Sequence, residues 1–214
     1  MEQSSDLPGR LAGHLSDAAV RYAEERHWDV VPGTWLRTDP AGVPRCSCGA
    51  PRCPAPGAHP TRPDWAARMS DDPHVVRHMW RKQPHASVLL PTGRTFDALE
   101  VSEGVGCLAL ARMERQGLLL GPVLTAPGRR LLFFVLSGAA DEIPDLLRRL
   151  GSAPELLDLA VLSGGRWVVA PPTATVPAGS AQWVHRLTPA NRWLPDAETV
   201  LGPLAYACAR DTTV

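Results

Sequence analysis

Three of the five cysteines lie between positions 46 and 53, inside a proline-rich stretch with little helical or strand periodicity. This stretch, at about residues 37–68, is expected to form an ordered loop or an inserted knuckle. Cys46, Cys48 and Cys53 are followed by His59 in the pattern C-x-C-x4-C-x5-H. Three thiolates and an imidazole complete a tetrahedral zinc shell, which is structural because no position remains for water or substrate. The alternative is a loop with reduced thiols and no metal.

The other two cysteines, Cys107 and Cys208, fall in apolar helical patterns and are expected to be core residues. Cysteines clustered in a chain of the cytoplasm favour a metal site over disulfides.

The first ten residues have neither a basic nor an apolar region of the kind found in export signals. No stretch approaches the roughly 20 apolar residues that a membrane helix needs. We therefore expect a cytoplasmic protein with no membrane partner.

Composition limits the class of protein. A chain of 214 residues with 44% hydrophobic content can bury a sizeable core within one domain. The 22 Lys and Arg residues balance the 22 Asp and Glu residues, which argues against coating nucleic acid by bulk charge. Between Arg37 and Arg94, however, nine basic residues stand against four acidic ones.

Hydrophobic periodicity predicts both helices and strands. The helices are expected at about residues 6–27, 70–82, 103–116, 141–150 and 196–209. Strands are expected at about residues 28–31, 86–90, 96–102, 123–126, 131–136, 156–162, 166–170 and 182–187. Because hairpin signals interrupt the alternation, the predicted class is α+β: a mixed, largely antiparallel sheet flanked by helices. The knuckle would be a small insertion in a single domain over residues 1–214.

Acidic residues occur inside the apolar strand predicted at residues 96–102. Strand alternation places Glu100 and Ser102 on one face. A buried carboxylate such as Glu100 needs a cation or a metal, because an isolated buried charge is costly. Asp158 lies in a similar apolar run, and the turn before residue 131 carries Arg129 and Arg130.

These charged residues have two interpretations. Acids on neighbouring strands beside an arginine pair suit a site for divalent metal and triphosphate. Alternatively, Glu100 forms an ion pair with Arg130 and Asp158 caps a strand end, which would be a structural arrangement.

The order of these pieces resembles the Prim-Pol domain of bifunctional DNA primase/polymerases, in the archaeo-eukaryotic primase superfamily. The resemblance runs from about Ala18 to Gly179. It is carried by a few short segments, which are His27 to Pro32, the knuckle from Cys46 to Pro60, Ser87 to Gly93 and, most specifically, Gly164 to Thr173.

The resemblance implies three catalytic motifs. Leu99-Glu100-Val101-Ser102 occupies the strand whose two acids bind divalent metals, with Glu100 in place of an aspartate as the first acid and Ser102 in place of the second acid. Arg130, next to Arg129, occupies the place of a histidine that contacts the phosphates of the nucleotide. Leu157-Asp158 matches the third motif, an apolar residue and a metal-binding aspartate.

The function implied by the resemblance is that of a nucleotide- and nucleic-acid-binding domain in DNA replication. Its partners would be nucleotides and single-stranded or primed DNA, and its cofactors a structural zinc ion and, if active, Mg²⁺ or Mn²⁺. Because Ser102 carries no charge for a metal, we expect template-directed nucleotidyl transfer to be weakened or lost. The alternatives are an active DNA primase/polymerase, and a zinc-stabilised regulatory module that binds a protein partner.

Overall fold

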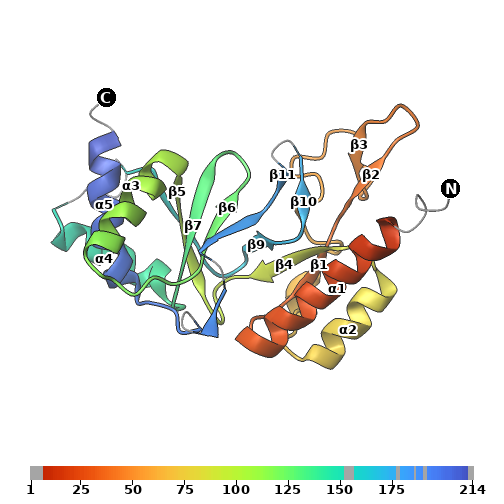
Figure 1. Cartoon of the computed structure of the whole chain (residues 1–214), viewed down its shortest axis with the longest axis horizontal. Coiled ribbons are helices and arrows are strands. Elements are labelled where there is room, and N and C mark those ends of the chain that lie inside the picture. The colour runs from red at the N-terminus through yellow and green to blue at the C-terminus, as the bar shows by residue number, and fades with distance from the viewer. Residues whose placement is uncertain (1–6, 152–156, 177–178, 186, 190–191, 212–214) are drawn as a thin grey trace. The chain divides into compact units, whose positions relative to one another are not determined.

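The computed structural model in Figure 1 describes residues 7–151, 157–176, 179–185, 187–189 and 192–211. The chain forms two compact units. Unit 1 combines residues 1–91 with 167–182, and unit 2 combines residues 92–166 with 183–214. Helices and antiparallel sheets make up both units, so the α+β prediction is confirmed. The single-domain organisation stays a prediction.

The helices lie close to their predicted positions. They are α1 (Leu7–Arg26), α2 (Pro73–Lys82), α3 (Glu103–Arg115), α4 (Ala139–Arg149), α5 (Ala197–Asp211) and the 3₁₀ turn η1 (Trp65–Ala67). The strands are β1 (Val31–Gly33), β2 (Leu36–Thr38), β3 (Pro44–Cys46), β4 (Ser87–Pro91), β5 (Asp97–Ser102), β6 (Val123–Ala126), β7 (Arg130–Val135), β8 (Leu159–Leu162), β9 (Trp167–Ala170), β10 (Ala174–Thr175), β11 (Gly179–Ser180) and β12 (Gln182–His185).

Unit 1 is built around β4, which is buried along its whole length between β1 and β9 in an antiparallel sheet. The Thr173 hydroxyl accepts a hydrogen bond from the Val88 amide at 2.9 Å, beyond the end of β9. Trp80 of α2 is fully buried and donates its indole N–H to the Ala86 carbonyl at 3.0 Å. Asp72 caps α2 by accepting from the His74 amide, so this helix has a defined start.

Unit 2 contains a five-stranded antiparallel sheet in the order β12-β6-β7-β5-β8. Helices α3, α4 and α5 cover one face of this sheet (Figure 1). Leu99 and Val101 of β5 point into the core on that side, as do Leu131 and Phe133 of β7. Because side chains alternate along a strand, Glu100, Ser102 and Arg130 belong to the opposite face.

The structure corrects three expectations. β1 covers Val31–Gly33 and not residues 28–31, because pairing with β4 begins at Val31 and continues through Pro32 and Gly33. The proline-rich stretch contains the hairpin β2–β3, which its periodicity did not reveal. Cys107 is exposed on α3, whereas Cys208 is buried as expected. The strand expected at 156–162 is β8, and Leu156 lies outside the described residues.

Candidate metal centre and carboxylate–arginine cluster

The β2–β3 hairpin holds the first two cysteines of the knuckle in unit 1. Cys46 ends β3 opposite Leu36 of β2. Beyond it, the amide of Ser47 donates to the carbonyl of Trp35 at 2.8 Å, and the amide of Trp35 donates back to the Ser47 hydroxyl at 3.0 Å. This reciprocal pair fixes the turn that carries Cys48.

A second set of contacts fixes the arm that carries His59. The amide of Thr34 donates to the His59 carbonyl at 2.7 Å, and the Trp167 indole N–H donates to the Ala58 carbonyl at 2.9 Å. Gly57 has a φ of +75°, and a Cβ there would lie 3.2 Å from the Leu36 side chain. A larger residue at this point would strain the turn that brings the chain back toward the cysteines.

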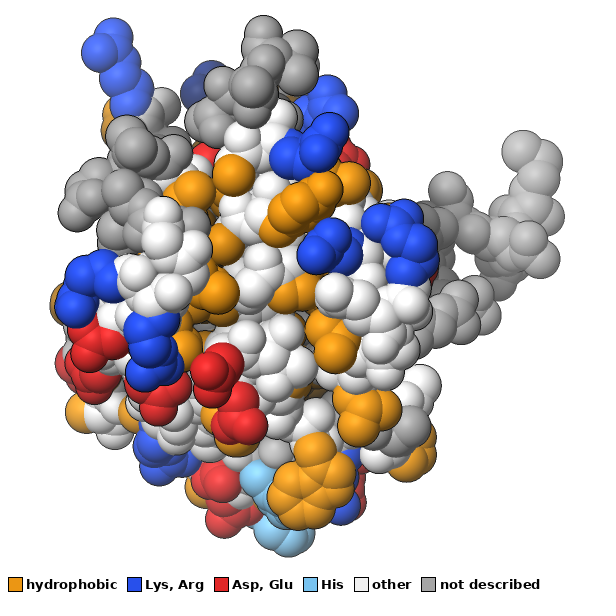
Figure 2. Space-filling model, turned by 90° about the vertical axis from the view of Figure 1, so that its left-hand side faces the viewer, with side chains coloured by type: hydrophobic (Ala, Val, Ile, Leu, Met, Phe, Trp, Pro, Cys, Tyr) orange, Lys and Arg blue, Asp and Glu red, His pale blue; other side chains and the backbone are white. Residues whose placement is uncertain are grey.

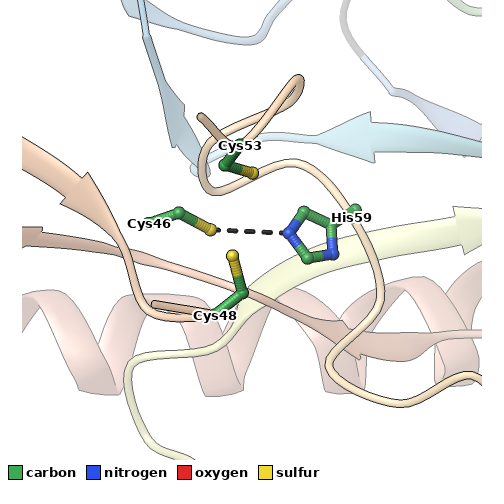
Figure 3. Close-up of side chains that lie close together, drawn as sticks. All are labelled: Cys46, Cys48, Cys53 and His59. Carbon is green, nitrogen blue, oxygen red and sulfur yellow. Dashed lines mark hydrogen bonds between the residues drawn. The ribbon is translucent and has the colours of Figure 1, made fainter. Parts of the chain in front are cut away.

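The four side chains converge (Figure 3). One ligand atom from each of Cys46, Cys48, Cys53 and His59 lies within 4.8 Å of all the others. Cys46 Sγ is 3.5 Å from His59 Nε2, and His59 Nδ1 is 3.0 Å from the Pro60 carbonyl oxygen. Since a carbonyl only accepts, Nδ1 carries the proton and Nε2 presents its lone pair to the sulfur atoms.

The thiols of this cluster differ in acidity. Burial opposes ionisation of Cys46, but hydrogen bonds from Thr34 and from the backbone of Cys48 and Gly57 outweigh it and lower the pKa to about 6. Burial raises the pKa of the Cys53 thiol to about 11, and the nearby Cys46 adds to the rise. One thiol therefore ionises readily while its neighbour resists a second negative charge, a conflict that a cation between them would remove.

The donor set fits zinc. A zinc ion with arms of about 2.3 Å spaces its sulfur ligands by about 3.8 Å, so the cluster has to contract by about 1 Å at most. Within the described part of the chain, it is the one group of three or more side chains placed to hold a metal ion. Cys46, Cys48, Cys53 and His59 could thus bind a metal such as zinc, as the sequence predicted.

The second cluster lies on the sheet of unit 2, on the face opposite α3, α4 and α5. Ser102, the last residue of β5, pairs with Arg130, the first residue of β7. Glu100 pairs with Leu132 on one side and with Ala160 of β8 on the other. Asp158 directly precedes β8. The strand register therefore brings the predicted acids and Arg130 to one end of the sheet.

Arg130 joins both carboxylates. Its Nε donates to Glu100 Oε1 at 3.0 Å, and its Nη1 lies 2.8 and 2.6 Å from the two carboxylate oxygens of Asp158. The hydrogen bond from Arg130 lowers the pKa of Asp158 against the opposing effect of burial, and Ser102 contributes further hydrogen bonds. The side chains of Arg130 and Glu100 are 22% and 26% exposed, whereas Asp158 is 50% exposed. The ion pair offered as the structural alternative is present.

Arg129 has a different role at the tip of the β6–β7 hairpin. It adopts a φ of +58°, and its side chain is 87% exposed. Its carbonyl accepts from the Glu103 amide at 2.8 Å, and its Nε donates to Glu103 Oε2 at the same distance. The hairpin tip is thus fastened to the start of α3, and Glu103 is occupied by Arg129.

Ser102 is the N-cap of α3. Its hydroxyl oxygen accepts from the Val105 amide at 3.4 Å, while the residue also hydrogen-bonds Asp158. The family motif gives Ser102 only the position of a second acid, and the cap is an additional role. The signal for the cap was a serine followed by Glu103 at the start of an apolar helical pattern.

Sequence reasoning missed a cavity of about 450 Å³ in unit 1, between α2 and the segment from Thr61 to Ser70. Its lining includes the side chains of Arg62, Arg68, His78 and Lys82, together with those of Trp65 and Met79. No acidic residue is among its described lining. Asp64 holds Arg62 and Arg68 through ion pairs of 2.9 and 2.7 Å. The cavity combines apolar walls with a basic rim.

The surface over the helices of unit 2 is mixed in charge. On the side of the molecule where α3, α4 and α5 lie, Lys and Arg side chains, Asp and Glu side chains and hydrophobic side chains all occur (Figure 2). This side therefore presents no charge of a single sign. No helix in the described ranges is both long and apolar enough to cross a membrane.

Comparison with models of protein families gives a match that covers most of the chain. Residues 19–193 match the family model described as "Bifunctional DNA primase/polymerase, N-terminal". The matched range begins in α1, contains the knuckle and the carboxylate–arginine cluster, and extends beyond β12. A search of curated proteins found no match.

Proposed function

Because the chain belongs to the bifunctional DNA primase/polymerase N-terminal family, we propose that it binds nucleotides and nucleic acid and that its template-directed nucleotidyl transfer is weakened or lost. Its partners are nucleotides and single-stranded or primed DNA. The chain acts in the cytoplasm, in DNA replication. These finer statements are proposals that rest on the family and on the chemistry of the two clusters.

Two surfaces support binding. The tip of the β6–β7 hairpin offers the exposed guanidinium of Arg129, which suits forked contacts to phosphate, whereas Arg130 is held by Glu100 and Asp158. The cavity of unit 1 adds a basic rim beside the Trp65 ring, which suits an anionic ligand with a flat apolar part. Nucleotides and single-stranded nucleic acid have this chemistry.

The observation that carries the proposed weakening is the occupation of Glu100 and Asp158 by Arg130. Mg²⁺ and Mn²⁺ prefer oxygen ligands, and two-metal phosphoryl transfer needs carboxylates that hold both ions. Here two carboxylates share one guanidinium, and Ser102 caps a helix. This donor set does not fit two divalent ions as it stands.

The knuckle, in contrast, has a donor set that fits its metal. Cys46, Cys48, Cys53 and His59 would hold zinc as a closed shell, which would crosslink the loop between β3 and Pro60 without taking part in chemistry. Zinc is therefore proposed as a structural cofactor. A divalent ion such as Mg²⁺ or Mn²⁺ would be needed only for residual transfer.

Primer extension with Mg²⁺ and with Mn²⁺ tests the weakened transfer. Wild type is expected to extend poorly or not at all. A variant with Glu100→Asp, Ser102→Asp and Arg130→His restores the family motifs and should gain extension if the arrangement of this chain is what limits it. Robust extension by wild type that Glu100→Ala abolishes would instead establish an active primase/polymerase.

Binding is tested separately by titrating ATP, GTP and short single-stranded DNA into the zinc-loaded protein. We expect saturable binding that weakens when Arg129 is replaced by Ala. Replacement of Arg148, an exposed arginine of α4 paired with Asp145, is the matched control and should change nothing. Absence of saturable binding for all three ligands would refute the proposed binding function.

A further inference from the structure

One guanidinium lies where two carboxylates meet. Arg130 uses Nε for Glu100 and Nη1 for Asp158, so two edges of the same planar group are engaged. The three contacts measure between 2.6 and 3.0 Å, in the range of charge-assisted hydrogen bonds. Two acids on neighbouring strands that share a cation in this way have the geometry of a small cation site whose cation belongs to the protein.

The strands hold the group in place. Arg130 and Glu100 come from β7 and β5, which pair along six registered positions. Glu100 and Arg130 are each about three-quarters buried, so their interaction is screened less than that of a surface pair. By contrast, Arg129 extends into solvent and pairs with Glu103. The two adjacent arginines therefore differ in what they neutralise.

We propose that Arg130 is the resident cation of this site and replaces a divalent metal ion between Glu100 and Asp158. The guanidinium supplies the positive charge that the two carboxylates need, and it repels a second cation brought to the same place. The wild-type site consequently excludes Mg²⁺ and Mn²⁺, and removal of Arg130 creates a divalent-cation site. This inference concerns the ion alone and holds whether or not the chain binds nucleotides.

The test measures Mn²⁺ binding without nucleotide, by loss of the electron paramagnetic resonance signal of free Mn²⁺, on zinc-loaded protein. Wild type is expected to show no saturable binding at this site. Arg130→Gln should bind Mn²⁺ at least about tenfold more tightly, because a unit charge within a few ångströms of the ion is gone. Mn²⁺ should also raise the melting temperature of this variant and not that of wild type.

Two controls identify the site. Arg129→Gln removes an adjacent arginine but leaves the two carboxylates bridged, so its Mn²⁺ binding without nucleotide should match that of wild type. Adding Asp158→Asn to Arg130→Gln should remove the acquired Mn²⁺ binding. The proposal is overturned if Arg130→Gln binds Mn²⁺ no more tightly than wild type, or if Arg129→Gln gains the same affinity.

If Arg130→Gln does not fold, Mn²⁺ binding to wild type and to Asp158→Asn tests the proposal instead. Saturable Mn²⁺ binding to wild type that Asp158→Asn abolishes would overturn the proposal, and its absence would support it. Primer extension and nucleotide titration are independent of this result, so failure of the proposed function and failure of this inference are distinguishable.

Discussion

The two clusters solve the same electrostatic problem in opposite ways. In unit 1, three thiols and an imidazole converge, with one ligand atom of each within 4.8 Å of the others. In unit 2, two carboxylates face a guanidinium that the chain itself provides. The first arrangement is complete only with an added cation, and the second already has its cation.

The difference teaches how to interpret ligand-like residues. Several cysteines brought together beside a neutral histidine favour metal, because their thiolates would otherwise repel one another. Carboxylates on adjacent strands carry less information, since arginine satisfies them equally well. Metal dependence should therefore be a property of unit 1 and charge pairing a property of unit 2, and each prediction below tests that contrast.

The largest effect is expected at the knuckle. Cys46→Ser should abolish the binding of one zinc ion per chain and lower the stability of the protein by about 4 kcal/mol or more, since structural zinc contributes about 10–16 kcal/mol in small metal-folded domains. Elemental analysis and thermal unfolding check both results. Cys107→Ser, at an exposed cysteine outside the cluster, is the control and should change neither.

Removal of the internal cation comes next. Arg130→Gln should lower the free energy of unfolding by about 1–2 kcal/mol, because two partly exposed carboxylates lose charge-assisted hydrogen bonds. Arg129→Gln removes one exposed ion pair and should lower the free energy of unfolding much less. Urea denaturation of the two variants makes the comparison. Equal losses would mean that Arg130 contributes no more than a surface arginine.

A smaller effect is expected at Ser102. Ser102→Ala should cost about 1 kcal/mol, because the Val105 amide at the start of α3 loses its cap. Ser102→Asn retains a capping side chain and should stay close to wild type in the same urea experiment. If Ser102→Ala and Ser102→Asn lower the free energy of unfolding equally, Ser102 stabilises the protein through its contact with Asp158 and not through the helix cap.

The smallest effect concerns Asp64, the inverse of the Arg130 cluster: one carboxylate between two arginines. Hydrogen bonds from Arg62 and Arg68 lower the pKa of Asp64 to about 2. A depressed pKa stabilises the folded state above the unfolded value, near 3.8, and the contribution is lost as the pH falls toward 2. Asp64→Asn should therefore lower the melting temperature slightly at neutral pH, and the difference should vanish in acid. A difference that grows below pH 4 would contradict this sign.

Sequence patterns were sufficient where a residue type has few uses. The spacing of Cys46, Cys48, Cys53 and His59 predicted a cluster that the structure assembles, since thiols and imidazoles gather for few other reasons. The alternation along β5 likewise predicted that Glu100 and Ser102 share one face, and the structure shows that Leu99 and Val101 on the other face pack in the core. Local rules of this kind survive folding because they depend on neighbours in sequence.

Other features required tertiary information. The β2–β3 hairpin has strands of three residues flanked by prolines, too short for any periodicity to show. The exposure of Cys107 depends on which side of α3 meets the sheet, and the helical pattern around it was apolar on both sides. The basic cavity brings α2 together with a loop that has no pattern of its own. The role of Ser102 depended on where β5 ended, which alternation alone does not define.

The interleaving of the two units along the chain has a consequence for synthesis and dissection. Along the chain, the segment from β5 to β8 separates β9 from the first part of unit 1. β9 nevertheless completes the sheet around β4 and anchors the knuckle through Trp167. A nascent chain must therefore hold β4 and the metal-binding loop unfinished until the intervening segment has left the ribosome. For the same reason no single cleavage releases either unit intact, so the smallest piece that folds like the native protein should contain both.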